Sequence, residues 1–140
     1  MWLNQQTLDA IRMMAALAGT WPNFIRASDL SGLTGVSITN VQKTANALGQ
    51  ARLVETARGR YGGLRLARSA DAITVGDVVR AFEPKDCPVS FLTASTHDDP
   101  VSQLLFRAHR DFFQPLEATS LFALEGKLRE SARAARLSRP

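Results

Sequence analysis

Cysteine is almost absent from this chain of 140 residues, whose only thiol belongs to Cys87. One cysteine cannot form an internal disulfide, so the fold is expected to hold without cross-links. The two histidines, His97 and His109, do not combine with Cys87 in any standard zinc spacing. The sequence therefore predicts no metal site, and stability must come from a hydrophobic core, which a chain of this length can bury.

Long apolar runs are also missing. No apolar stretch approaches the roughly 20 residues that a helix needs to cross a bilayer, so we expect no membrane span. The N-terminal stretch MWLNQQTLDAIRMMAALAG lacks a basic leader and shows helical spacing in place of a continuous apolar segment. The sequence thus predicts no signal peptide and a cytoplasmic protein.

Residue constellations typical of catalysis are absent from the sequence as well. It holds no nucleophile–base pair, no phosphate-binding loop and no pair of carboxylates at a usable spacing. We therefore do not expect an enzyme.

Acidic residues are scarce in the first half of the chain. Residues 1–68 contain eight Lys and Arg against three Asp and Glu, a net charge of +5, whereas residues 69–140 contain nine against ten, a net charge of −1. Such asymmetry favours a polyanion-binding module joined to a neutral partner, assembly or sensor module. An ordinary basic surface would give the same charge, so charge alone leaves both interpretations open.

The apolar spacing of the first 50 residues predicts three helices. Residues 3–18 follow the 3.6-residue period of an amphipathic helix. Ser28 is expected to cap a short helix over 29–33, and Ser37 a second helix that ends near residue 50, because a serine oxygen accepts an unpaired amide of the first turn. Between the two, Gly35 permits a turn with positive φ.

The helix after Ser37 is predicted to have two unlike faces. Val41, Ala45 and Leu48 form an apolar face, with Val36 and Ile38 expected to pack near its start. The opposite face is polar and almost free of acid, which suits base edges and phosphates better than solvent alone. Its members are Thr39, Asn40, Gln42, Lys43 and Asn46.

The stretch RLVETARGRYGGLRLAR, residues 52–68, predicts a hairpin. Residues 53–57 and 64–67 are strand candidates, and the loop between them is rich in glycine. Helix, turn, polar helix and hairpin in this order are typical of a winged helix-turn-helix, in which the hairpin is the wing. Thr74 and Asp77 then form a capping box, which predicts a further helix over 75–82.

The rest of the chain is predicted to be a loop followed by helices. Residues 84–100 mix Pro, Ser, Thr and Asp without periodicity. A helix with an apolar stripe begins at Val101 and is expected to be kinked or interrupted at Pro115. A second helix is expected over 120–133, with a frayed tail beyond it.

Together these elements give the predicted fold class, which is mainly α with a small β-hairpin wing. We predict a winged helix-turn-helix domain over 1–83, a sensor-type loop over 84–100 and a helical dimerisation region over 101–140.

Three segments resemble the Rrf-two-type family of bacterial winged-helix regulators. They are MWLNQQTLDAIRMMAALA, LVETARGRYGGLRLAR and ITVGDVVRAFEP, which resemble the opening helix, the wing and the helix after the wing. The second segment is the most specific, because its GRxGGxxLAR pattern is followed at the family's distance by ITVGDVV. The likeness covers the first 84 residues well and the remainder loosely.

The resemblance implies a dimeric, sequence-specific DNA-binding regulator, expected to be a repressor. Its two recognition helices would enter successive major grooves of a palindromic double-stranded operator, and its wings would reach the neighbouring minor grooves. Guanidinium groups also suit phosphates and a narrow minor groove on physical grounds. By this analogy the DNA-binding residues are Ser28, Ser37, Thr39, Asn40, Gln42 and Lys43 of the helix-turn-helix, with Arg58, Arg60 and Tyr61 of the wing. Arg65 and Arg68 are expected to be bystanders.

The apolar stripe of the long helix is expected to supply the homodimer interface. The small domain already covers itself with its first helices, so some of the stripe needs a partner. The candidate interface residues are Leu104, Leu105, Ala108, Phe112 and Leu116. His109 is expected to lie at the surface or in the interface.

Cluster-binding members of the family carry three cysteines in the loop where this chain has only Cys87. A stable iron–sulfur cluster normally needs several thiolates, so we expect none here, and no other cofactor. In some relatives an acidic residue of the first helix adds a ligand, and the nearest residue here, Asp9, is out of register by one.

Three models of sensing remain open. Cys87 is a candidate redox sensor; the loop and long helix could form a pocket for a small-molecule effector; or the chain responds to a partner protein or to nothing. A protein-interaction or assembly module that does not bind DNA specifically is the alternative function.

Overall fold

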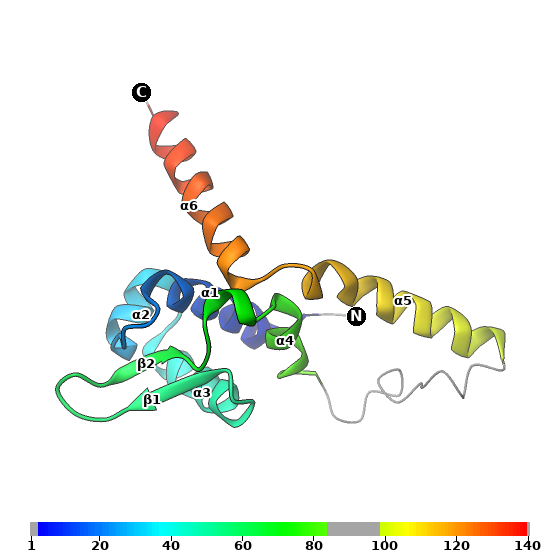
Figure 1. The fold of residues 1–140 in the computed structure, drawn as a ribbon, viewed down its shortest axis with the longest axis horizontal. Helices are drawn as coiled ribbons and strands as arrows, with labels where there is room; N and C mark the ends of the chain where they lie inside the picture. The colour runs from blue at the N-terminus through cyan, green and yellow to red at the C-terminus, as the bar shows by residue number, and fades with distance from the viewer. Residues whose placement is uncertain (1–2, 84–98, 140) are drawn as a thin grey trace.

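The computed structural model describes residues 3–83 and 99–139, and within them the chain is mainly helical with one β-hairpin. Figure 1 shows the first four helices and the hairpin gathered into one body, from which the last two helices extend in different directions. The predicted fold class is therefore confirmed. The elements are α1 (Gln5–Thr20), α2 (Ala27–Thr34), α3 (Ile38–Gln50), β1 (Val54–Ala57), β2 (Gly63–Leu66), the 3-10 helix η1 (Ala70–Ala72), α4 (Val75–Arg80), α5 (Pro100–Glu117) and α6 (Leu121–Leu137).

Helix α1 lies at the centre of the hydrophobic core. It packs against α2, α3, α4, β2 and α6. Met13, Met14 and Leu17 of α1 are fully buried, as are Leu48 of α3 and Leu66 of β2. Since burying one large apolar side chain contributes about 1.5–3 kcal/mol, this single helix organises much of the stability of the body.

The core continues beyond the predicted domain boundary at residue 83. Phe113 of α5 and Leu121 of α6 are fully buried in the same cluster of side chains as α1. The backbone is tied there as well, because the Val75 amide donates to the Thr119 carbonyl at 2.9 Å and the Leu121 amide to the Ile73 carbonyl at 2.8 Å. The second half of α5 and the start of α6 are thus structurally part of the same body as the first four helices and the hairpin.

Polar contacts also join α4 and the residues just after it to α5, and they show that His109 is not an open surface residue of its own chain. Its side chain is only 12% exposed, with Nε2 3.3 Å from a carboxylate oxygen of Glu83. The ring also packs on Phe113, at 4.9 Å between centroids. Next to it the Arg80 guanidinium lies over the Phe113 ring at 4.2 Å and pairs with Glu117. His109 is therefore mostly covered within its own chain, by Glu83 just after α4 and by Phe113 of α5.

Several predicted helix ends are confirmed and others are wrong. Thr74 and Asp77 form the predicted capping box. Pro115 does not interrupt α5, because it lies in the last turn, where its missing amide removes only one helical hydrogen bond. The tail expected to fray is helical as far as Leu137. Helix α1 likewise continues through Gly19 to Thr20.

Of the two predicted serine caps, only Ser37 is confirmed. Its hydroxyl accepts a hydrogen bond from the Asn40 amide at 3.3 Å. Helix α2 begins earlier than predicted, after Arg26, and Ser28 is an exposed residue of its first turn. The reason is tertiary, because Ile25 pairs with Leu64 of the hairpin and keeps the chain extended up to Arg26. Ile38 is also misplaced by the prediction, since it is 48% exposed at the start of α3, whereas Val36 is buried.

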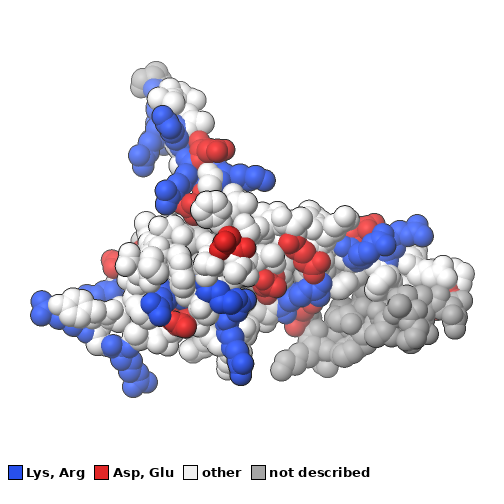
Figure 2. Space-filling view, viewed as in Figure 1, with Lys and Arg blue, Asp and Glu red and all other residues white. Residues whose placement is uncertain are grey.

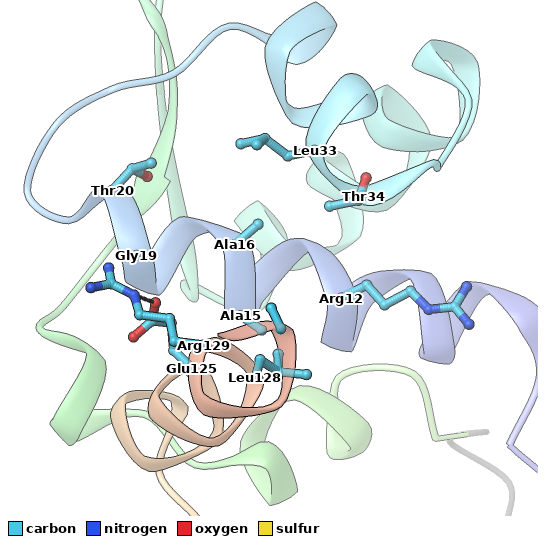
Figure 3. Close-up of a pocket in the computed structure, with 11 residues that line it drawn as sticks. Arg12, Ala15, Ala16, Gly19, Thr20, Leu33, Thr34, Glu125, Leu128 and Arg129 are labelled. Carbon is cyan, nitrogen blue, oxygen red and sulfur yellow. Dashed lines mark hydrogen bonds and ion pairs between the residues drawn. The ribbon is translucent and has the colours of Figure 1, made fainter. Parts of the chain in front are cut away.

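Helix α6 leaves the body after its first turns. Leu121 is fully buried, but Leu128 is 51% exposed. Beside it an apolar groove of about 540 Å³ opens between α1, the end of α2 and α6, with Ala15 and Ala16 on one side and Leu33 on another (Figure 3). The far half of α6 is therefore not covered by its own chain.

None of the helices described in residues 3–83 and 99–139 combines the length and apolar character that crossing a bilayer requires.

The two serines give a matched test of the capping assignment. We expect Ser37→Ala to lower the free energy of unfolding by about 1 kcal/mol, because an amide of the first turn of α3 loses its acceptor. Ser28→Ala should change it by less than about 0.5 kcal/mol, as for a surface substitution without a partner. Urea unfolding of the DNA-free protein measures both, and equal losses would contradict the assignment.

Candidate nucleic-acid interface

The exposed polar side chains of α3 are uncharged except for one cation, Lys43, and the apolar Ile38 is exposed at the start of the helix. Helix α2 ends at Gly35, whose φ of +74° turns the chain, and α3 starts three residues later. Val41, Thr44 and Leu48 fix the orientation of α3 by pointing into the core. No acidic residue occurs between Asp29 and Glu55. The predicted residues Ser37, Thr39, Asn40, Gln42 and Lys43 are all exposed on this helix, together with Asn46.

The hairpin lies beside α3 and carries the basic loop. Its strands are antiparallel, with Val54 opposite Leu66 and Ala57 opposite Gly63. A groove of about 220 Å³ between the two elements has Gln42 and Asn46 on the α3 side and Thr56 on the hairpin side. Ala27, Ala45 and Leu64 also line this groove, so the polar side chains of α3 and of the hairpin face each other across a mainly apolar floor.

The loop between the strands brings Arg58, Arg60 and Tyr61 together at its tip. All three are exposed, Tyr61 to 84%. The Arg60 guanidinium lies 5.7 Å from the centre of the Tyr61 ring, within cation–π range. Figure 2 shows Lys and Arg side chains at the end of the molecule that carries this loop. The wing tip is a small positive surface at one end of the α3 face.

Arg65 and Arg68 differ from the tip arginines because protein atoms engage them. Arg65 pairs with Glu55 on the opposite strand, at 2.9 Å between Nη2 and Oε2. Arg68 donates to the Arg52 carbonyl at 3.2 Å. This agrees with the expectation that the wing tip, and not the second strand, offers the free cations.

The structure adds Arg26, which sequence reasoning missed. Arg26 is exposed just before α2, and its Nη2 donates to the Arg60 carbonyl at 3.3 Å. A groove of about 550 Å³ lies between its segment and the wing loop, lined also by Asp29 and Tyr61. Ser28 is exposed in the same first turn of α2. The only available signal was a cation directly before a helix, which is too common to be specific.

The predicted dimer stripe divides into two parts. Leu104 and Leu105 are 64% and 44% exposed, and Ala108 is exposed as well. Phe112 and Leu116 instead pack partly against the core of their own chain. The first part of the stripe is therefore uncovered and the second part is not.

The metal-ligating residues do not assemble in the described part of the chain. Residues 3–83 and 99–139 contain no group of three His, Cys, Asp or Glu side chains that could hold a metal ion. Asp9 is buried and accepts a hydrogen bond from the Gln5 amide nitrogen at 2.9 Å. Cys87 and the rest of the predicted sensor loop up to residue 98 lie outside the described residues.

A helix-turn-helix with an exposed second helix and an adjoining basic hairpin defines a winged helix-turn-helix protein. Residues 3–125 match the model of the Rrf2 family, described as an iron-dependent transcriptional regulator. The chain belongs to this family, as the wing motif predicted, and it is a DNA-binding transcriptional regulator.

Similar proteins support this assignment. Protein aau3 of Rhizobium meliloti strain 1021 is 33% identical over 127 residues, covering 86% of this chain and 82% of that protein. The structure of CymR (YrzC), the global cysteine regulator of B. subtilis, matches with a TM-score of 0.72 and 25% identity, covering 91% and 98% of the two chains. IscR of T. potens matches with a TM-score of 0.75, covering 94% and 90%; at 20% identity this likeness concerns the fold.

Proposed function

We propose that the protein is a homodimeric repressor that binds a palindromic operator through α3 and the wing, and that it works without an iron–sulfur cluster. The observation that carries the proposal is the shared surface of α3 and the wing, where exposed amides and hydroxyls adjoin a basic tip and no acid intervenes along α3. Repression needs no additional surface, because a dimer seated on an operator excludes other proteins from that DNA.

The α3 residues suit the major groove. The amides of Asn40 and Gln42 can bond the N6 and N7 edge of adenine in a bidentate manner. Lys43 and the hydroxyls of Ser37 and Thr39 suit phosphates or base edges, and phosphate contacts set the register of the protein on the duplex. These roles follow from side-chain chemistry and from the exposure of all five residues.

The wing suits the minor groove and the backbone. Arg58 and Arg60 are exposed at its tip, and a narrow minor groove attracts arginine through its negative potential. Tyr61 supplies an exposed ring beside Arg60. Arg26 lines the groove next to the wing and donates to the Arg60 carbonyl, so it supports the wing loop.

The uncovered part of α5 is proposed to pair with the same surface of a second copy. Val101, Leu104 and Leu105 are exposed apolar side chains on a helix segment that extends from the body. Two winged domains joined in this way would read half-sites about one helical turn of DNA apart. Such a protein acts where its DNA is, which supports the cytoplasm as its location.

The donor set does not fit an iron–sulfur cluster, although the family is described as iron-dependent. Only one thiolate is available in the whole chain, and Asp9 is already engaged by Gln5. We therefore propose another effector, with the Cys87 thiol and a small molecule as the two candidates.

Arg60→Ala tests the DNA contact. Because it removes one cation from the phosphate backbone, the slope of log affinity against log salt should fall by about one unit. The probe is a duplex selected by the wild-type protein from a random-sequence pool. Arg68→Ala is the matched control and should keep the wild-type slope, because Arg68 is engaged by the Arg52 carbonyl. Failure of the wild-type protein to bind any duplex would instead favour the interaction module.

Leu104→Glu tests the dimer. A carboxylate in the α5 interface should convert the protein to a monomer and lower affinity for the selected duplex about a hundredfold or more, because bivalent binding is lost. Leu137→Glu, at another exposed leucine at the far end of α6, serves as control. Light scattering measures the mass, and a Leu104→Glu protein that remains dimeric would exclude this surface.

Iron analysis tests the cofactor proposal. Protein purified without oxygen should show no visible absorption band and far less than one iron per chain, because one thiolate cannot hold a stable cluster. A coloured protein with two or more irons per chain, lost on Cys87→Ser, would contradict the proposal.

A further inference from the structure

The segment between α1 and α2 acts as a third strand beside the wing. The Ile25 amide donates to the Leu64 carbonyl at 2.9 Å, and the Leu64 amide donates back at 2.7 Å. Gly63 makes this approach possible, since a Cβ there would lie 2.1 Å from the Ile25 carbonyl oxygen. This single bridge links the wing to the residue that directly precedes the N-cap of α2.

Arg65 reinforces the bridge from the next position on β2. Its Nε donates to Glu55 on β1 at 2.9 Å. Its Nη1 donates to the Pro22 carbonyl at 3.4 Å, and its guanidinium lies over the Phe24 ring at 4.4 Å from the centroid. One side chain thus joins both strands of the wing to the α1–α2 segment.

The strands of the wing are anchored in the core through Val54, Leu64 and Leu66, but its exposed loop is not. An isolated two-stranded hairpin is marginal in water. On the α2 side, the groove of about 550 Å³ separates the wing loop from the α1–α2 segment, so close packing does not fix its angle there. Arg65 lines this groove together with Phe24 and Arg26.

We infer that Arg65 is a positioning residue that sets the angle of the wing against the helix-turn-helix through Phe24, Glu55 and the Pro22 carbonyl, and so determines operator affinity without contacting DNA. The inference rests on the proposed function, in which the wing and α3 bind one duplex together. The donors of Arg65 face protein acceptors, whereas the wing-tip arginines are exposed.

Exchange of Arg65 for lysine separates positioning from a charge contact. Arg65→Lys keeps the positive charge but loses the planar fork that bonds Glu55 and Pro22 while stacking on Phe24. Both Arg65→Lys and Arg65→Ala should bind the duplex selected by the wild-type protein about tenfold more weakly, with an unchanged salt slope. Affinity for an unrelated duplex should stay the same, because non-specific binding depends on backbone charge.

A double-mutant cycle with Phe24→Ala tests the link itself. Phe24→Ala alters no charge and should reproduce the loss of Arg65→Lys. Because both variants remove the same contact, the double variant should be no more than about twofold weaker than the weaker single variant. All affinities are measured well below the unfolding temperature of each variant, so that unfolded protein does not contribute to the differences in affinity. Arg68→Ala, which removes an arginine without a link to this segment, should bind within about twofold of wild type.

Several results would overturn the inference. Wild-type affinity of Arg65→Lys, combined with a slope lowered by about one unit in Arg65→Ala, would make Arg65 a phosphate contact. The inference would also be excluded if the losses of affinity in Arg65→Lys and Phe24→Ala multiplied fully in the double variant. An Arg68→Ala protein that lost as much affinity as Arg65→Ala would exclude it as well. Failure of the proposed function is distinguishable, because the wild-type protein would then bind no duplex at all.

Discussion

Two backbone hydrogen bonds between Ile25 and Leu64 hold the proposed DNA-binding surface together. They join the end of the α1–α2 connection to the second strand of the wing, so the start of α2 and the position of the wing are set by the same contact. Gly63 is required because its Cβ would collide with the Ile25 carbonyl. Arg65 and Arg26 extend the link on either side, toward Phe24 and toward the wing tip. Together with the packing of β1 on α3, this small region is inferred to set the spacing between α3 and the wing tip.

The other half of the molecule is organised by burial. Phe113 and Leu121 anchor α5 and α6 to the core around α1, which leaves the first half of α5 and the far half of α6 uncovered. A helix that is fixed at one end and apolar on an exposed face is well suited to hold a second copy at a defined distance. The account thus assigns DNA contact to α3 and the wing, and pairing to the extended part of α5.

Local signals in the sequence predicted much of the fold. Ser37, the Thr74–Asp77 capping box and the glycine-rich hairpin were predictable because their chemistry acts over a few residues. Ser28 failed as a cap because a pairing between Ile25 and Leu64, distant in sequence, decides where α2 begins. Similarly, periodicity could not tell buried Phe113 from half-buried Phe112, or show that Glu83, just after α4, would pair with His109. The sequence could separate the tip residues Arg58 and Arg60 from Arg65 and Arg68, but only the contacts reveal that Arg65 joins three partners.

The central claim is that α3 and the wing read one duplex together, twice per dimer. A combined footprint on the selected duplex tests this most directly, with guanine N7 methylation reporting on the major groove and hydroxyl-radical cleavage on the backbone and minor groove. The account predicts two protected major-groove regions about 34 Å apart, each with a protected minor-groove region beside it. Protection of a single major-groove region, or of major grooves without the adjoining minor grooves, would contradict it.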